Sequence, residues 1–262
     1  MSRAALFVAL LLAAAGCRTA ATRLPLPADD PRPLALLRAW QESADARRAL
    51  RGSARLAVDG DGPPVRARQI LVVERPSRLR VEVQGLLSQT LAVLVTDGPR
   101  YQLFRAEDAS LESGDVHPGL LWRVASLDLT PEEAIDLVLG APRLDASLAP
   151  SRAYSTRDGE IGVELADAAG LPRERRVFDA QGRLRGVERL APDGAALWSA
   201  RFDDYQPVGS VPFAHAIRVE AAGRSARAEL LLSGVELNPA LPVDIFQLRP
   251  VRSGGRADGK GG

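Results

Sequence analysis

Apolar and polar residues alternate along most of this chain with the period of two that is typical of β-strands. In residues 79–83 three aliphatic side chains alternate with an arginine and a glutamate, and residues 91–95 contain a second aliphatic series. Because successive side chains of a strand point to opposite faces, this pattern predicts antiparallel strands with one dry and one wet face. Turn sequences rich in Gly, Pro and Asp divide residues 52–113 into five or six such strands. Seven more are predicted at 152–156, 161–165, 173–178, 183–190, 196–205, 213–221 and 226–237.

Two segments instead repeat apolar residues every three or four positions, which predicts helices. The first helix is expected over residues 34–50. The second helical region is expected between about His117 and Gly140, where Thr130 and Glu133 form a capping box at a helix start. Gly140 ends that helix, because glycine readily adopts the left-handed conformation found after a helix.

Together these elements predict a mainly β (α+β) fold. We expect a strongly curled antiparallel sheet, or half-open barrel, of about 11 strands, covered by the N-terminal helix and the mid-chain helical insert. The dry face of such a sheet must be covered, and a loose cover encloses an apolar cavity. The residues expected to line it, or else to form a filled core, are Leu79, Val81, Val83, Leu91, Val93, Val95, Trp122, Ile135, Phe213, Ile217 and Val219.

The N-terminus has the pattern of a bacterial lipoprotein signal peptide. Arg3 precedes an unbroken apolar run over residues 4–15, which is too short for the roughly 20 residues that cross a bilayer. Residues 14–17, Ala-Ala-Gly-Cys, resemble a lipobox, with alanine where leucine is usual at the first position. The sequence therefore predicts a signal peptide over residues 1–16 and a lipid anchor at Cys17. The alternative is an ordinary secretory signal that happens to end at a cysteine.

The remaining chain divides by composition. Prolines cluster in residues 17–33, which predicts an extended tether. Residues 34–250 are expected to form one domain, and the Gly-rich, polar residues 251–262 a disordered tail. Cys17 is the only cysteine, as suits a protein of the oxidising cell envelope.

Composition argues against several classes of function. The formal net charge is +1, which does not favour nucleic-acid binding. One cysteine and two histidines cannot build a Cys/His zinc site, and we expect no metal or other cofactor. His215 shares an apolar strand face with Phe213 and Ile217 and is interpreted as a core residue. Since no catalytic motif is present, we do not expect an enzyme.

The region from Leu79 to Pro142 resembles the LolA/LolB superfamily of lipoprotein carriers and receptors. It contains a strand, the turn Gly85-Leu86-Leu87-Ser88, another strand and an insert that ends Leu-Val-Leu-Gly-Ala-Pro over residues 137–142. The chain end from Pro212 to Phe246 is similar to lipoprotein-sorting domains. The lipobox makes LolB, itself a lipoprotein, the closer parallel. LolB carries an exposed leucine on a loop between two early strands, so the resemblance implies that Leu86 or Leu87 inserts into a membrane, unless both fold inward.

The resemblance implies a function without chemistry. The protein would be anchored in the outer membrane, on its periplasmic face, and would bind lipid or lipoprotein acyl chains in the cavity. Its partners would be membrane lipid through the acylated Cys17, lipid or lipoprotein cargo, and a LolA-like periplasmic carrier. Arg18 agrees with the outer membrane, because the known retention signal at that position is aspartate. The alternative is a membrane-tethered structural or interaction lipoprotein of the same fold with no cargo.

Overall fold

A computed structural model describes residues 23–61, 63–222 and 226–248. The predicted signal peptide, the anchor Cys17 and the predicted tail over residues 251–262 lie outside the described residues. Within them the chain is mainly β, as predicted, and almost all of the strands belong to hairpins between sequence neighbours.

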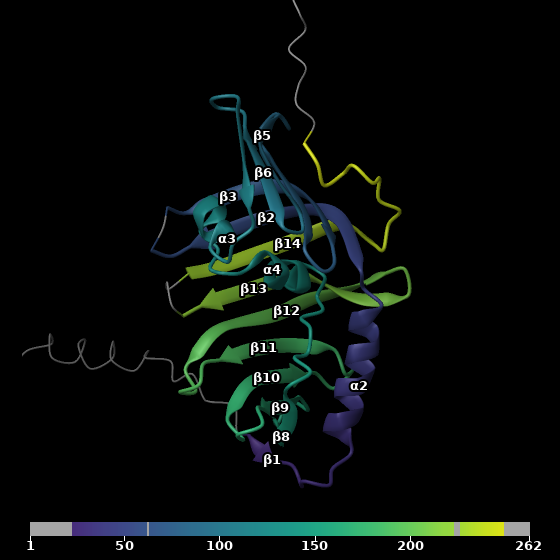
Figure 1. Ribbon diagram of the computed structural model, residues 1–262. Helices are drawn as coiled ribbons and strands as arrows, with labels where there is room; N and C mark the ends of the chain where they lie inside the picture. The colour runs from purple at the N-terminus through teal and green to yellow at the C-terminus, as the bar shows by residue number, and fades with distance from the viewer. Residues whose placement is uncertain (1–22, 62, 223–225, 249–262) are drawn as a thin grey trace, which may run out of the picture.

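One antiparallel sheet of 14 strands dominates the molecule (Figure 1). Its order is β1-β8-β9-β10-β11-β12-β13-β14-β2-β3-β4-β5-β6-β7, and it does not close into a barrel. The strand count exceeds the predicted 11, partly because β1 lies in the Pro-rich segment that was expected to be a tether. The strands are β1 (Leu24–Pro25), β2 (Ala49–Asp59), β3 (Val65–Glu74), β4 (Arg78–Gln84), β5 (Thr90–Asp97), β6 (Arg100–Arg105), β7 (Ser110–Asp115), β8 (Ala149–Ser155), β9 (Ile161–Ala166), β10 (Pro172–Phe178), β11 (Leu184–Leu190), β12 (Ala196–Val208), β13 (Val211–Ala221) and β14 (Ala226–Leu237).

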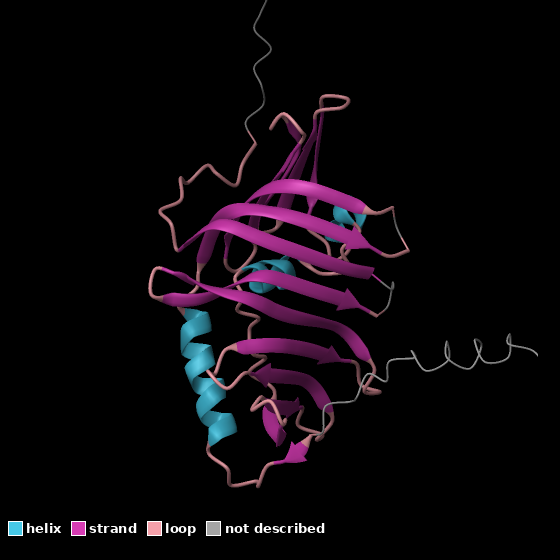
Figure 2. Cartoon of the chain, turned by 180° about the vertical axis from the view of Figure 1, so that it is seen from behind, coloured by secondary structure: helices cyan, strands magenta, loops and turns pink. Residues whose placement is uncertain are grey.

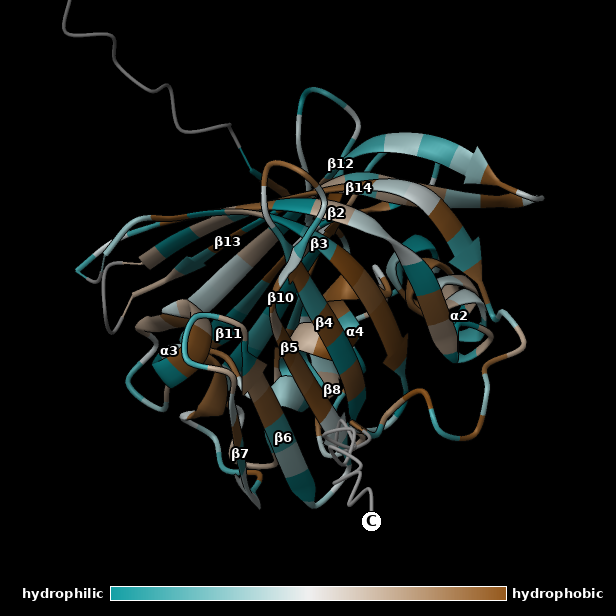
Figure 3. Cartoon of the chain, turned by 90° about the horizontal axis from the view of Figure 1, so that it is seen from above, coloured by the Kyte–Doolittle hydropathy of each residue, from teal (hydrophilic) through white to brown (hydrophobic). Residues whose placement is uncertain are grey.

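Three helices accompany the sheet: α2 (Arg32–Asp45), α3 (Leu120–Ala125) and α4 (Pro131–Val138). Helix α2 runs along one side of the sheet (Figure 2). Seen from above, the upper strands curve around α3 and α4, and brown and teal residues alternate along β4 (Figure 3). The predicted capping box of α4 is confirmed, since the Glu133 backbone N–H donates to Thr130 Oγ1 at 3.2 Å and the Thr130 N–H donates to Glu133 Oε2 at 2.9 Å.

Helix α2 ends five residues earlier than predicted, and Leu50 belongs to β2. The cause is a side chain distant in the sequence. Asn238 accepts hydrogen bonds from the Arg48 and Ala49 backbone N–H groups at 2.8 and 3.1 Å, and its Nδ2 donates to the Ala46 carbonyl at 2.8 Å. These three bonds replace helical hydrogen bonds and turn the chain from α2 into β2.

Replacing Asn238 by alanine should therefore destabilise the protein. Loss of the three bonds at a half-exposed junction, together with an alanine at φ +51°, predicts a decrease of about 2–3 kcal/mol in the free energy of unfolding. Urea denaturation measures this. Asn238→Gly is the matched control. It removes the same three hydrogen bonds, but glycine adopts the positive φ without strain, so its loss of stability measures the hydrogen bonds alone. A wild-type stability for Asn238→Ala would show that Asn238 does not hold the junction.

A fully buried ion pair lies under the lower half of the sheet. Glu174 and Arg176 are both completely inaccessible and point from β10 toward α2. The Arg176 guanidinium donates to the Arg143 carbonyl at 2.9 Å and lies 4.0 Å from the centroid of the Trp40 ring. Burial lowers the pKa of Arg176, and the Glu174 carboxylate opposes that shift. This pair joins β10, α2 and the segment after α4.

Candidate functional site

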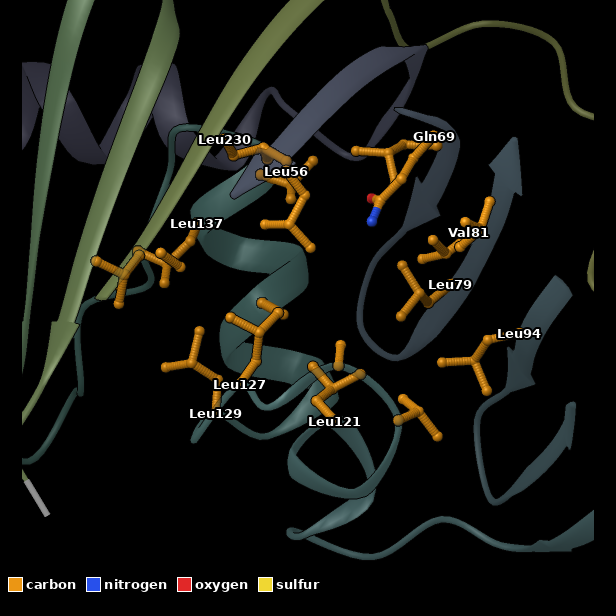
Figure 4. Close-up of a pocket in the computed structure, with 18 of the residues that line it drawn as sticks. Leu56, Gln69, Leu79, Val81, Leu94, Leu121, Leu127, Leu129, Leu137 and Leu230 are labelled. Carbon is orange, nitrogen blue, oxygen red and sulfur yellow. The ribbon is translucent and has the colours of Figure 1, made fainter. Parts of the chain in front are cut away.

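An apolar pocket of about 160 Å³ lies between the upper sheet and the helical insert (Figure 4). Seven strands supply the sheet wall, which consists of Leu56, Gln69, Leu71, Leu79, Val81, Val83, Ala92, Leu94, Leu103, Ile217, Val219, Ala228 and Leu230. The α3–α4 insert supplies the other wall, which consists of Leu121, Val124, Ala125, Leu127, Leu129, Ala134, Leu137 and Val138. Among these described residues, Gln69 alone is polar.

The strand pattern explains the sheet wall. Leu79, Val81 and Val83 face the pocket because Arg80 and Glu82, between them on β4, take the outer face. On two other strands of the wall alanines occupy inward positions, at Ala92 on β5 and Ala228 on β14. Small side chains opposite large ones leave the space that the pocket occupies.

Five of the eleven residues predicted from the sequence line this pocket: Leu79, Val81, Val83, Ile217 and Val219. Leu91, Val93 and Val95 do not, because they take the outer face of β5. Both faces of β5 are apolar since the C-terminal segment covers part of its outer face, with buried Phe246 and Val95 lining one surface depression. Thr90 pairs with Gln84 and Ala92 with Val83, so Leu91 is an extra residue in a bulge.

The other three predicted residues lie in or against filled core. Ile135 and Phe213 are completely buried and do not border the pocket. Trp122 is half-buried and packs against the core from α3, whereas its neighbour Leu121 reaches the pocket. His215 is half-buried, with Nδ1 3.2 Å from the Phe213 carbonyl oxygen and its ring edge-on to Phe213.

Two arginines fasten the end of the insert to the rest of the fold. Arg47 Nη1 donates to the carbonyls of Leu139 and Gly140 at 3.3 and 3.0 Å, and Arg75 donates to the carbonyl of Ala141. Arg75 Nε also lies 3.1 Å from the Asp136 carboxylate. Burial lowers the pKa of Arg75, and Asp136 opposes the shift. Nothing in the sequence distinguishes these two arginines from the many others.

The insert is also held at its beginning. Arg123 of α3 lies 2.7 Å from the Glu112 carboxylate and donates to the Tyr101 hydroxyl at 2.8 Å. A surface groove beside this contact is lined by Arg105, Glu107 and Leu91, and it shares Ala92, Leu103 and Val124 with the pocket wall. The groove between β5, β6 and α3 therefore adjoins the pocket.

The β4–β5 turn presents two leucines to solvent. Leu86 is 91% exposed and Leu87 is 90% exposed, so neither folds into the core. The turn is closed by a hydrogen bond from the Gly85 N–H to the Gln89 carbonyl at 2.8 Å, and Ser88 has φ +60°. We call residues 85–88 the leucine turn.

Three arginines and one glutamate line a groove that begins at the leucine turn. Leu86 borders it together with Arg55, Arg66, Arg68 and Glu229. Arg55 and Arg68 are directly opposite each other on β2 and β3, and neither pairs with an acidic group among the described residues. Arg66 instead lies 2.7 Å from Asp59. Like charges opposite each other destabilise a sheet, and an anionic partner would relieve them.

Comparison with known proteins identifies the fold. No protein-family model matches the sequence, and no curated protein matches it. A solved LolA superfamily protein from Nitrosomonas europaea aligns over 80% of this chain and 97% of its own, with 15% identity and a TM-score of 0.53. This chain has a LolA/LolB-like fold. A DUF1329 family protein from Desulfovibrio piger shares the LolA/LolB-like fold over 83% of this chain and 98% of its own, with 10% identity and a TM-score of 0.54.

The described residues of this LolA/LolB-like chain contain no group of three or more His, Cys, Asp or Glu side chains arranged to hold a metal ion. In the same part of the chain, no helix is both long and apolar enough to cross a membrane.

Proposed function

We propose that this chain is a cell-envelope lipoprotein, anchored in the outer membrane by an acylated Cys17, that binds acyl chains of lipids or lipoproteins. The apolar pocket between sheet and insert carries the proposal. Twenty of its 21 lining residues are apolar, and an acyl chain requires no polar partner along its length. The LolA/LolB-like fold supports the same class of ligand, because the solved relative belongs to the LolA superfamily.

The energetics suit transfer without chemistry. Removing about 15 methylenes from water contributes on the order of 12 kcal/mol before the ligand's lost freedom is counted. A chain in a bilayer is already out of water, so its exchange between membrane and pocket is nearly balanced. Small differences in fit then decide the direction of transfer, and no nucleotide or cofactor is needed.

The pocket must widen to take a whole chain. A cavity of about 150 Å³ accommodates a benzene-sized molecule, and ligand sites for larger molecules measure roughly 300–1,000 Å³. The present 160 Å³ therefore holds part of an acyl chain. We infer that α3 and residues 126–130 move away from the sheet when the chain enters, because this part of the insert lines the pocket next to the adjoining groove.

The leucine turn and its arginine groove support contact with a membrane. Two fully exposed leucines in one turn are costly in water unless they contact something apolar. The neighbouring Arg55 and Arg68 would face phosphate groups when the leucines enter the acyl region. The protein would thus receive or deliver a lipid at the membrane surface, in exchange with a LolA-like carrier, as a step in lipoprotein localisation or lipid transfer.

Lipid binding can be tested on the mature chain from residue 17, which keeps every residue that the structure describes. Cys17→Ser removes the anchor, so that extracted lipid comes from the pocket. We expect mass spectrometry to find bound acyl lipid, and the apolar dye N-phenyl-1-naphthylamine to bind and be displaced by monopalmitoylglycerol. A protein without lipid or dye binding would contradict the proposal and favour a tethered interaction protein.

A pocket-filling variant makes the test specific. Ala228→Phe places a ring in the pocket from β14 and should reduce dye affinity at least tenfold, since it occupies most of a 160 Å³ space. Arg227→Phe puts the same ring on the opposite, exposed face of the same strand and should leave dye affinity unchanged. Equal affinities in the two variants would place the binding site elsewhere.

A further inference from the structure

One polar side chain faces the apolar pocket. Gln69 of β3 is only 7% exposed, and its amide points into the space between Leu56 and Val81 (Figure 4). Its cross-strand neighbours are Ala54 and Val83, which offer no polar side-chain atom. The Gln69 amide forms no hydrogen bond with any other residue in the part of the chain that the structure describes.

An amide in such a place is unfavourable without a partner. Burying it without a hydrogen bond costs free energy, whereas a leucine at the same position would complete the apolar wall. The amide has two N–H donors and a carbonyl acceptor free to meet a ligand. Gln69 is therefore the point at which the pocket can distinguish a ligand with a hydrogen-bonding group from a plain hydrocarbon.

The position of Gln69 gives the ligand a direction. Val83, its partner on β4, lies two residues before the leucine turn, while Leu79 lines the pocket toward the opposite end of β4. The polar group thus marks the end of the pocket nearest to the leucine turn. A lipid entering from a membrane at that turn would leave its linkage near Gln69 and send its tail toward Leu79 and the insert.

We propose that the Gln69 side-chain amide donates a hydrogen bond to the carbonyl oxygen of an ester- or amide-linked acyl chain. The ligand class is then an acyl ester, as in a glycerolipid, or an N-acyl amide, as in a lipoprotein; lipids without a carbonyl bind less well. This inference rests on the proposed function, since it presupposes that an acyl chain occupies the pocket.

Three ligands that differ at the linkage test the proposal. Monopalmitoylglycerol contains an ester, N-palmitoylethanolamine an amide, and 1-O-hexadecylglycerol an ether without a carbonyl. Displacement of N-phenyl-1-naphthylamine from the mature Cys17→Ser chain gives each affinity. We expect the ester, the amide or both to bind about five- to tenfold more tightly than the ether, as one buried hydrogen bond allows. If the ester has the larger affinity relative to the ether, the natural ligand is a glycerolipid; if the amide has, it is a lipoprotein.

Gln69→Leu removes the amide while keeping the volume, and should reduce the preference over the ether to about one. Gln206→Leu, at an exposed position of β12 away from the pocket, is the matched control and should keep the wild-type preference. If all ligands bind but Gln69→Leu keeps the preference, or the wild type has none, this inference is overturned and the proposed function stands. If the wild type binds none of them, both are overturned.

Discussion

Replacing Glu174 with glutamine is expected to lower the free energy of unfolding by about 3–5 kcal/mol, because it leaves the Arg176 charge buried without a counter-charge. Both side chains are completely inaccessible, so water cannot take the place of the carboxylate. Glu174 also lies 3.5 Å from Arg189, whose charge would lose its partner too. For a domain of this size the melting temperature should fall by about 10 °C. Urea and thermal unfolding at neutral pH measure both quantities.

Two further variants show whether the buried charge is the cause. Glu229→Gln removes a half-exposed partner of Arg218 and should cost less than about 1 kcal/mol. The double variant Glu174→Leu/Arg176→Met replaces the pair by apolar side chains, which is often neutral, and Met can contact the Trp40 ring. It should recover most of the lost stability. A double variant as unstable as Glu174→Gln would show that apolar side chains cannot replace the pair, and that its hydrogen bonds, including the one to the Arg143 carbonyl, contribute as much stability as the paired charge.

The second large effect is expected at the leucine turn. Leu86→Asp/Leu87→Asp should reduce binding to lipid vesicles by about 100-fold, since two leucines that enter the acyl region contribute roughly 3 kcal/mol. Both side chains are almost fully exposed, so the substitution should leave the melting temperature unchanged. Co-sedimentation of the mature Cys17→Ser chain with phosphatidylethanolamine and phosphatidylglycerol vesicles measures the partition coefficient.

The matched control introduces the same two negative charges at a different part of the surface. Leu171 and Leu197 are 43% and 50% exposed and do not belong to the leucine turn. Leu171→Asp/Leu197→Asp should bind vesicles within about twofold of the same chain without these changes, because these side chains lie outside the proposed contact. Equal losses in both double variants would show that added negative charge, and not loss of the leucine turn, weakens binding.

The sequence predicts the sheet well because strand periodicity and turn residues are local. The seven strands after residue 150 lie where alternation indicated, and the α4 capping box is readable from Thr130 and Glu133. The predicted end of α2 was wrong because the helix end is set by the hydrogen bonds of Asn238, which lies nearly 200 residues away in the sequence. Local patterns contain no information on such a partner.

The pocket was harder to predict than the fold. Alternation identifies Leu79, Val81 and Val83 because charged residues mark the other face of β4, but β5 is apolar on both faces. Gln69, Glu174 and Arg176 are buried in the protein, although residues of these types are usually exposed to solvent. Only the packed structure reveals polar groups that are buried, since their neighbours come from distant parts of the chain.

The short strand β1 constrains how an anchored molecule can be oriented. Leu24 is paired with Ser155 at one edge of the sheet, where β1 lies at the bottom of Figure 1, whereas β5, which follows the leucine turn, lies at the top. Ten strand spacings separate β1 from β4, or about 50 Å along the curved sheet. Seven residues from Cys17 to Leu24 reach at most about 25 Å. If Cys17 is acylated, as proposed, a molecule that stands upright on this anchor would thus direct its leucines away from the anchoring membrane, and only a molecule that lies lengthwise could insert them into it.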